Sequence, residues 1–289
     1  MEQIFNSEFY EKLHTLRMSI ALNIAGGQAG GRKSNAKGNS VEFSDFREYM
    51  IGDDIRRIDW NAYGRFDRLF VKLFMEEKEG VFNIFLDSSE SMKYGEDPKE
   101  VCAKRIAGAL SYIVLDNGDR LYINTMKDKR LVTGGSYSGM QSFIKCLKFL
   151  EDSEFAGEQD IFEGIKDKSF KAKGLSFLIT DCYRNNLDEV IKYLKYKKQD
   201  VVVIQVLSNE ELDPRYEGTL NLNDCETSGQ LRVSFSANAV KIYKDTLKKF
   251  LEETEQTCKK YGAIYIRVNS SDSCDSLFFS SLAKLAKKV

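Results

Sequence analysis

The fold is decided by one stretch, Val81-Phe82-Asn83-Ile84-Phe85-Leu86-Asp87-Ser88-Ser89-Glu90-Ser91-Met92, in which an apolar run ends abruptly on a carboxylate. Two hydroxyls follow Asp87 at alternate positions, Ser89 and Ser91. A buried strand that opens into this loop brings three oxygen ligands together, and such ligands suit Mg²⁺ or Mn²⁺ rather than zinc. The stretch therefore predicts a strand of an α/β domain that ends in a candidate metal site.

Downstream of this stretch, short apolar strands alternate with amphipathic helices. We expect strands at 81–86, 119–125, 130–133, 174–180, 200–207 and 262–268, and helices at 98–114, 138–151, 160–168, 187–197, 238–260 and 274–288. Asp97 and Glu100 are expected to form a capping box around Pro98 at the start of the first of these helices. A small β insertion is expected at 217–235. The alternation predicts a doubly wound, mostly parallel, Rossmann-like α/β sheet over residues 79–289, with helices on both faces.

Residues 1–78 have a different character. Apolar side chains at helical spacing predict an amphipathic helix over 8–24, and a polar, glycine-rich loop follows over 25–41. Residues 42–75 interleave charges of both signs with aromatic side chains, which favours an ordered ion-pair network. We expect this extended segment to pack on the main domain, with Trp60 as a packing anchor.

A second carboxylate, Asp181, ends the expected strand 174–180. Because the carboxyl ends of parallel strands meet at one edge of a sheet, Asp87, Ser89, Ser91 and Asp181 are expected to form a site for Mg²⁺ or Mn²⁺. An open position there could accept a carboxylate from a partner protein. Asp160 is either a further oxygen ligand or the cap of the helix that begins near Ile161. Helix capping remains open for Asp87, and a turn-forming role remains open for Asp181.

The Asp-x-Ser-x-Ser pattern at Asp87, Ser89 and Ser91 resembles the metal-ion-dependent adhesion site (MIDAS) of von Willebrand factor A domains, and Asp181 resembles the later aspartate of that site. The resemblance covers residues 81–207 and implies a metal-dependent protein-binding function. The adhesion site also contains a threonine, and Gln159 stands at the position where that threonine is expected.

A longer passage upstream resembles the signature of a bacterial family, domain of unknown function 58 (DUF 58). Within it the matching residues are Glu42, Phe43, Arg47, Tyr49, Gly52, Asp53, Asp54, Arg57, Asp59 and Trp60. The resemblance covers about residues 25–270. It implies a von Willebrand A-like domain that is commonly encoded beside a MoxR-type AAA+ ATPase.

Composition excludes some classes of function. The 43 Lys and Arg residues nearly balance the 44 Asp and Glu residues, so no net positive charge favours nucleic acid as a partner. No run approaches the roughly 20 apolar residues of a transmembrane helix, and no secretory signal begins the chain, which together predict a cytoplasmic protein. The six cysteines form no Cys-x-x-Cys pair and are expected to be reduced, and His14, the only histidine, makes a zinc site improbable.

These observations predict a non-enzymatic protein-interaction module that works with a MoxR-type AAA+ ATPase in protein assembly or remodelling. Two alternatives stay open. One is a Mg²⁺-dependent phosphohydrolase with Asp87 as nucleophile, although Ser89 stands where such an enzyme needs a second carboxylate as acid and base. The other is a structural interaction protein with a vestigial metal site, which Gln159 motivates.

Overall fold

The computed structural model describes residues 4–15, 42–75, 79–170, 172–184, 186–214, 218–223 and 230–273. The chain divides into two compact units, and each is described by itself. The larger unit comprises Met1–Ala29 and Gly80–Val289, and the smaller unit is Gly30–Glu79. The N-terminal helix belongs to the larger unit. The helix expected at 274–288 lies outside the described residues.

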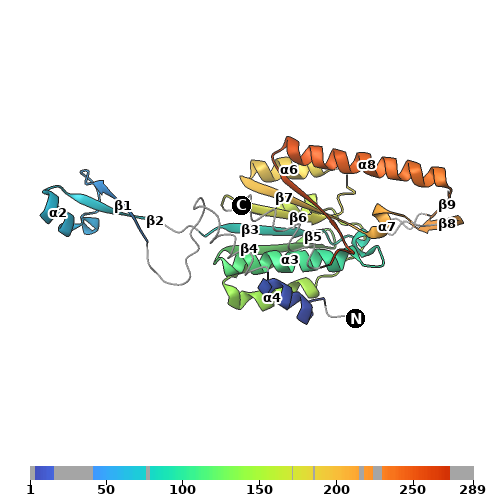
Figure 1. Cartoon of the computed structure of the whole chain (residues 1–289), viewed down its shortest axis with the longest axis horizontal. Helices are drawn as coiled ribbons and strands as arrows, with labels where there is room; N and C mark the ends of the chain where they lie inside the picture. Colours follow the sequence, from blue (N-terminus) through green and yellow to red (C-terminus); the bar gives the residue numbers. More distant parts are fainter. Residues whose placement is uncertain are drawn as a thin grey trace. The chain divides into compact units, whose positions relative to one another are not determined.

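A six-stranded sheet forms the centre of the larger unit (Figure 1). Its order is β10-β7-β6-β3-β4-β5. Neighbouring strands run parallel except for β4 and β5, which are antiparallel. The strands are β3 Val81–Leu86, β4 Arg120–Lys127, β5 Arg130–Ser138, β6 Gly174–Thr180, β7 Gln199–Leu207 and β10 Ile264–Asn269. The predicted mostly parallel α/β fold is confirmed. The chain moves outward from β3 in one direction and then returns to β6 on the other side, so the winding reverses between these two strands.

The central strands β3, β6 and β7 are buried on both faces, and their successive side chains point to opposite sides of the sheet. Ile84 and Leu86 belong to one apolar core, whereas Phe85 between them belongs to the other. The first core includes side chains of α3 (Lys99–Asp116), α4 (Phe143–Glu151) and a helix over residues 7–15. The second includes side chains of α5 (Ile161–Asp167), α6 (Leu187–Tyr196) and α8 (Ala237–Lys260). The doubly wound arrangement therefore follows from strands that are apolar on both sides.

The N-terminal helix is an integral part of the first core. Phe9 and Leu13 are buried, and the rings of Phe5 and Phe9 lie 4.9 Å apart. Gly108 of α3 faces these rings, and a Cβ atom at Gly108 would come within 2.8 Å of the Phe5 ring. The prediction of a helix is confirmed for the described residues 7–15, and residues 16–24 lie outside them.

The predicted cap of α3 is wrong. The helix begins at Lys99, its N-cap residue is Pro98, and no side chain caps it. Asp97 lies in the preceding turn, and its carbonyl oxygen accepts a 2.7 Å hydrogen bond from the Ser270 hydroxyl beyond β10. This contact between distant segments holds Asp97 outside the helix, although the local sequence predicts Asp97 as its cap.

The strand expected over 130–133 continues to Ser138. Gly134 and Gly135, which directly follow the expected range, form a bulge within the strand. The pairing of β5 with β4 shifts between Tyr122 and Asn124, and Gly135 has a φ of 103°. This left-handed backbone conformation is accessible to glycine, so the pair kinks the edge strand without ending it.

The predicted β insertion is confirmed. β8 (Gly218–Asn223) and β9 (Gln230–Phe235) pair antiparallel. They stand between a short helix, α7 (Asn209–Leu212), and α8.

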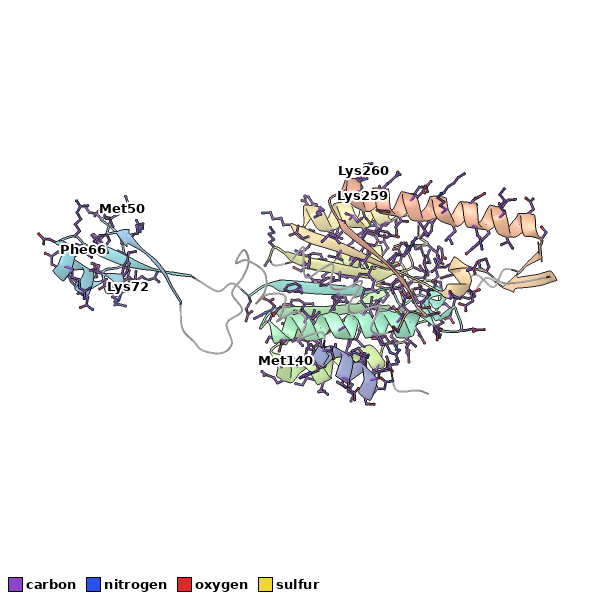
Figure 2. All side chains as sticks on the ribbon, in the orientation of Figure 1. Met50, Phe66, Lys72, Met140, Lys259 and Lys260 are labelled. Atoms are coloured by element: carbon purple, nitrogen blue, oxygen red, sulfur yellow. The ribbon has the colours of Figure 1, made fainter. Side chains whose placement is uncertain are left out.

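The smaller unit consists of β1 (Glu42–Glu48) paired antiparallel with β2 (Phe70–Met75), a 3-10 turn, η1 (Ile55–Arg57), and α2 (Trp60–Phe66). Met50, Phe66 and Lys72 mark it in Figure 2.

Several signature residues define the local geometry of this unit. The Asp54 carboxylate caps η1, and the Asp59 carboxylate caps α2 while pairing with Lys72 at 3.2 Å. Arg47 pairs with Asp53 at 2.7 Å. Charges of opposite sign in this unit therefore form local ion pairs. Trp60 does not act as an anchor within the unit, because 64% of it is exposed.

Candidate metal centre

Asp87 continues β3 by one residue. Its backbone N–H donates to the Ile179 carbonyl of β6 at 2.9 Å, so the loop begins only after it. One oxygen of its carboxylate accepts from the Ser89 N–H at 3.1 Å, and the other accepts from the Thr180 hydroxyl at 2.7 Å. The side chain is almost fully buried. The register of β3 with β6 thus sets Asp87 beside Thr180 and one residue from Asp181.

The loop after Asp87 is tied to two neighbouring segments. The Ser88 hydroxyl donates to the Met126 carbonyl at 2.7 Å and accepts from the Met126 N–H at 2.9 Å. The Ser88 carbonyl accepts from the Ala156 N–H, and the Glu90 N–H donates to the Gly157 carbonyl. Ser88, which the sequence analysis did not select, therefore holds in place the backbone of the loop that carries Ser89 and Ser91.

The two serines and Asp181 form a continuous chain of oxygen atoms. The hydroxyls of Ser89 and Ser91 lie 3.0 Å apart, and the Ser91 hydroxyl donates to Asp181 Oδ2 at 2.9 Å. Cys182 follows with a φ of 64°, and the Tyr183 N–H then donates to Asp181 Oδ1 at 3.2 Å. This sharp backbone turn holds the Asp181 carboxylate towards the serines. The structure brings these three predicted residues together, with Asp87 bonded to the backbone of Ser89.

A buried lysine, Lys99, joins this cluster from the first turn of α3. Its ammonium group contacts Asp181 Oδ2 at 2.9 Å and Glu211 Oε1 at 2.7 Å, and the residue has no exposed surface. The Tyr183 ring lies 5.1 Å from the nitrogen. Sequence reasoning missed Lys99 and Glu211. The available signal was helical periodicity, since Lys99 precedes Cys102, Ala103 and Ile106 on the buried face of α3.

Glu211 is held as firmly as Lys99. Ser208 and Glu211 form a capping box at the start of α7, in which Glu211 Oε2 accepts from the Ser208 N–H at 2.7 Å. The other oxygen, Oε1, is the one that binds Lys99. Because Ser208 follows β7 directly, Glu211 reaches the site from the strand next to β6.

The charges in this buried cluster influence one another. Burial, followed by the negative charge of Asp181, raises the pKa of Asp87 above its ordinary value. Burial alone would lower the pKa of Lys99, but Asp181 and Glu211 together raise it. Lys99 is therefore a stable ammonium ion, and Asp87 is a carboxylate that a nearby cation would favour in its ionised form.

Gln159 and Asp160 occupy the neighbouring loop. The amide of Gln159 accepts from the Lys129 N–H and donates to the Ala156 carbonyl, so it braces two loops. The Asp160 carboxylate caps α5 through the Phe162 N–H and accepts from Asn186 at 3.0 and 3.1 Å. A cavity of about 20 Å³, large enough for one water molecule, is lined by Asp87, Gln159 and Asp160 among others. The capping role of Asp160 is present, and its role as a ligand stays a prediction.

The donor set fits a hard divalent cation. Among the described residues, no group of three or more His, Cys, Asp and Glu side chains could hold a metal. The cluster instead offers two carboxylates and two hydroxyls at the end of β3. These are the oxygen ligands that Mg²⁺ and Mn²⁺ accept, usually together with water.

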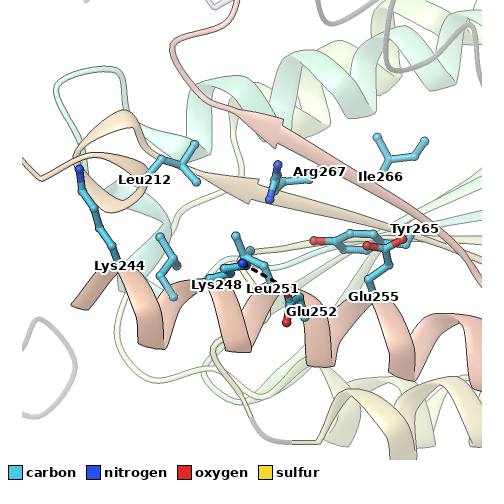
Figure 3. Close-up of a pocket in the computed structure, with 10 residues that line it drawn as sticks. Leu212, Lys244, Lys248, Leu251, Glu252, Glu255, Tyr265, Ile266 and Arg267 are labelled. Carbon is cyan, nitrogen blue, oxygen red and sulfur yellow. Dashed lines mark ion pairs between the residues drawn. The ribbon is translucent and has the colours of Figure 1, made fainter. Parts of the chain in front are cut away.

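A separate groove of about 880 Å³ lies between α8 and the edge strand β10 (Figure 3). Leu212, Leu251 and Ile266 supply apolar lining, while Lys248, Glu252 and Arg267 supply charges. None of the residues predicted to form the metal site lines this groove. One link between the groove and that site passes through Tyr265, whose hydroxyl donates to Gln205, which in turn donates to the Asp181 carbonyl.

The mostly parallel sheet, the reversal of winding between β3 and β6, and the Asp-x-Ser-x-Ser loop at that point define a von Willebrand factor A-like domain. The profile of the family described as "Protein of unknown function DUF58" matches residues 45–251, well over half of the chain. The chain therefore belongs to this family.

Curated relatives are mycobacterial proteins described as uncharacterized. Mb1516 of Mycobacterium bovis and Rv1480 of Mycobacterium tuberculosis are each 22% identical to this chain over 213 residues. The alignment covers 70% of this chain and 65% of each relative. The chain thus spans slightly under two thirds of the length of these relatives.

Similar solved structures include two proteins from Bacteroides. BatB from Bacteroides thetaiotaomicron has 19% identity and a TM-score of 0.47, with 72% of this chain and 99% of that one covered. An aerotolerance-related membrane protein from Bacteroides fragilis has 18% identity and a TM-score of 0.46, with coverage of 73% and 100%. The SpRpn10 VWA domain has 12% identity and a TM-score of 0.40, with coverage of 70% and 94%. Within the described part of this chain, no helix has the length and apolar character needed to cross a bilayer.

Proposed function

We propose that this chain is a protein-interaction module that binds a carboxylate of a partner protein through Mg²⁺ or Mn²⁺ at the end of β3. The observation that carries the proposal is the spacing of 3.0 and 2.9 Å along the chain of oxygens from Ser89 through Ser91 to Asp181. Neighbouring ligands of one Mg²⁺ ion lie about 3 Å apart, because each lies about 2.1 Å from the metal in octahedral geometry. Asp87, Ser89, Ser91 and Asp181 would hold the ion, with Asp160 as a further candidate.

Binding rather than catalysis is supported by the residue types around Asp87. Ser89 stands where a phosphohydrolase needs a second carboxylate, and its hydroxyl contacts Ser91. Two aromatic side chains beside the site, Tyr94 and Tyr183, are 44% and 43% exposed. Aromatic residues are enriched in protein interfaces, so these side chains suit a surface that docks a partner.

We further propose that the chain works with a MoxR-type AAA+ ATPase in assembling or remodelling other proteins. The support is its membership of the DUF58 family, for which such an ATPase is the partner that the resemblance implies. In this arrangement the ATPase supplies work from nucleotide hydrolysis, and the metal site selects the protein that is bound.

The test of the proposed function is a binding titration between this chain and the purified MoxR-type ATPase of the same organism, with Mg²⁺ and then with a chelator. We expect binding to be lost both with the chelator and in Asp87→Ala. Asp200→Asn is the matched control, because Asp200 is an exposed carboxylate near the start of β7, at the amino-terminal ends of the parallel strands and away from the site. Equal binding by wild type and Asp87→Ala would contradict the proposed function.

Metal binding is also expected to release protons. Burial and Asp181 raise the pKa of Asp87, and only the ionised carboxylate is a metal ligand. Mg²⁺ affinity should therefore fall as the pH falls through this raised pKa. Calorimetry in two buffers with different ionisation enthalpies measures the released protons directly. Binding heats that do not depend on the buffer would show that Asp87 does not change its protonation on binding.

A second candidate is an interaction module that works without a metal. Two observations favour it: Lys99 already supplies a cation to Asp181, and Gln159 braces two loops in place of the expected threonine. In this case partner binding would persist with the chelator and would be lost only on disrupting the surface around Tyr94 and Tyr183.

A further inference from the structure

Resting on the metal-dependent function proposed above, we propose that Lys99 is a permanent second cation of the site. In this view its charge, balanced by Glu211, sets how tightly Asp87, Ser89, Ser91 and Asp181 hold a divalent metal.

The first support is the position of the ammonium group. Lys99 Nζ and the Ser91 hydroxyl bind the same oxygen, Asp181 Oδ2, both at 2.9 Å. A metal held by Ser91 and Asp181 therefore lies one ligand away from a fixed positive charge. Because Lys99 is fully buried, bulk water cannot screen this charge as it would at the surface.

The second support is that the charge cannot move away. Lys99 comes from α3, Asp181 from the end of β6 and Glu211 from α7, so three elements converge on one ion pair network. Glu211 is itself locked by the capping box with Ser208. The Tyr183 ring covers the nitrogen at 5.1 Å.

The third support is the charge balance. Asp87, Asp181 and Glu211 contribute three negative charges, and Lys99 contributes one positive charge, which leaves a formal charge of −2. One divalent cation neutralises this cluster. The positive charge of Lys99 thus weakens the attraction of the site for the metal, and the negative charge of Glu211 strengthens it.

Two possible roles for Lys99 predict opposite changes in metal affinity when the lysine is removed. If Lys99 acts as a competing cation, its removal strengthens metal binding, since the metal then meets three uncompensated carboxylates. If Lys99 serves only to hold Asp181 in position, its removal lets Asp181 shift and weakens metal binding. The sign of the change in affinity therefore separates the two roles.

The experiment is calorimetric titration of Mg²⁺ into wild type, Lys99→Met, Glu211→Gln and the double variant. On Coulombic grounds we expect Lys99→Met to bind on the order of tenfold more tightly and Glu211→Gln on the order of tenfold more weakly. The double variant restores the formal charge of −2 and should bind within about threefold of wild type. Lys104→Met is the matched control, because Lys104 is another buried lysine of α3 whose ammonium group binds the carbonyls of Glu151 and Ser153. Its affinity for Mg²⁺ should not change.

Each outcome is decisive for the role of Lys99. Equal or weaker binding by folded Lys99→Met overturns it. If Lys99→Met does not fold by circular dichroism, Glu211→Gln decides, because its capping box can persist with glutamine and an unchanged affinity overturns the role. Binding by Lys99→Met but not by wild type supports Lys99 as the competing cation while removing the metal from the proposed function. Absence of binding in all four proteins overturns both.

Discussion

Replacing Phe9 with alanine is expected to lower the free energy of unfolding by about 3–5 kcal/mol. The Phe9 ring has no exposed surface and packs on Phe5 at 4.9 Å. It also faces Gly108, which has no side chain to fill the space that the ring would leave. Urea unfolding followed by circular dichroism measures the change. A single transition with an unchanged slope is expected, because Phe9 belongs to the same core as Ile84 and Leu86.

The neighbouring residue supplies the control. Tyr10 lies on the same helix but is 43% exposed, so Tyr10→Ala should cost less than about 1 kcal/mol. If both variants unfold at the same urea concentration as wild type, the N-terminal helix does not contribute to the core of the larger unit. The comparison thereby tests whether the extended segment over 42–75 interrupts a domain that begins before it.

The central strands could be predicted because they are apolar on both faces. The predicted strand 81–86 has the same bounds as β3 in the structure. The predicted strand 174–180 likewise has the bounds of β6, which ends at the residue before Asp181. The meeting of Asp87, Ser89, Ser91 and Asp181 followed from the rule that ligands bind at the carboxyl ends of parallel strands. These parts of the fold depend on local pattern and on a topological rule, and both can be read from one sequence.

The counter-ion of the site could not be predicted in the same way. Glu211 lies 112 residues after Lys99, and neither local sequence predicts that the two residues pair. The error at Asp97 has a similar origin, since its carbonyl bonds to Ser270 at a separation of 173 residues. Gln159 stands at the position expected for a ligand, yet its amide braces two loops through backbone groups. In each case a contact outside the local pattern overrides a local preference.

Replacing Asp87 with asparagine is expected to have two large effects of opposite sign. Metal affinity should fall by more than about 100-fold, because changes even to residues around metal ligands cost 10–100-fold and Asp87 is proposed as a ligand itself. The free energy of unfolding of the metal-free protein should rise at neutral pH, because burial and Asp181 disfavour the charged carboxylate that asparagine replaces. Asparagine can keep the contacts with the Ser89 N–H and the Thr180 hydroxyl, since its amide both accepts and donates.

The sign of the stability effect follows from the raised pKa of Asp87. Burial and Asp181 disfavour the ionised carboxylate in the folded state, so folding takes up protons between the ordinary pKa of aspartate and the raised value. Stability of wild type should therefore fall as the pH rises through this window. The asparagine side chain of the Asp87→Asn variant carries no charge, so this part of the pH dependence should disappear in the variant.

Thermal melts of wild type and Asp87→Asn between acidic and neutral pH, each with and without Mg²⁺, measure both effects. Without the metal, the two proteins should converge in stability at low pH and separate at neutral pH, with the variant more stable. With Mg²⁺, only wild type should gain stability, because binding to the folded state stabilises it by mass action. A variant that is less stable at neutral pH, or that gains as much from Mg²⁺ as wild type does, would show that Asp87 is a structural carboxylate rather than a buried charge reserved for a metal.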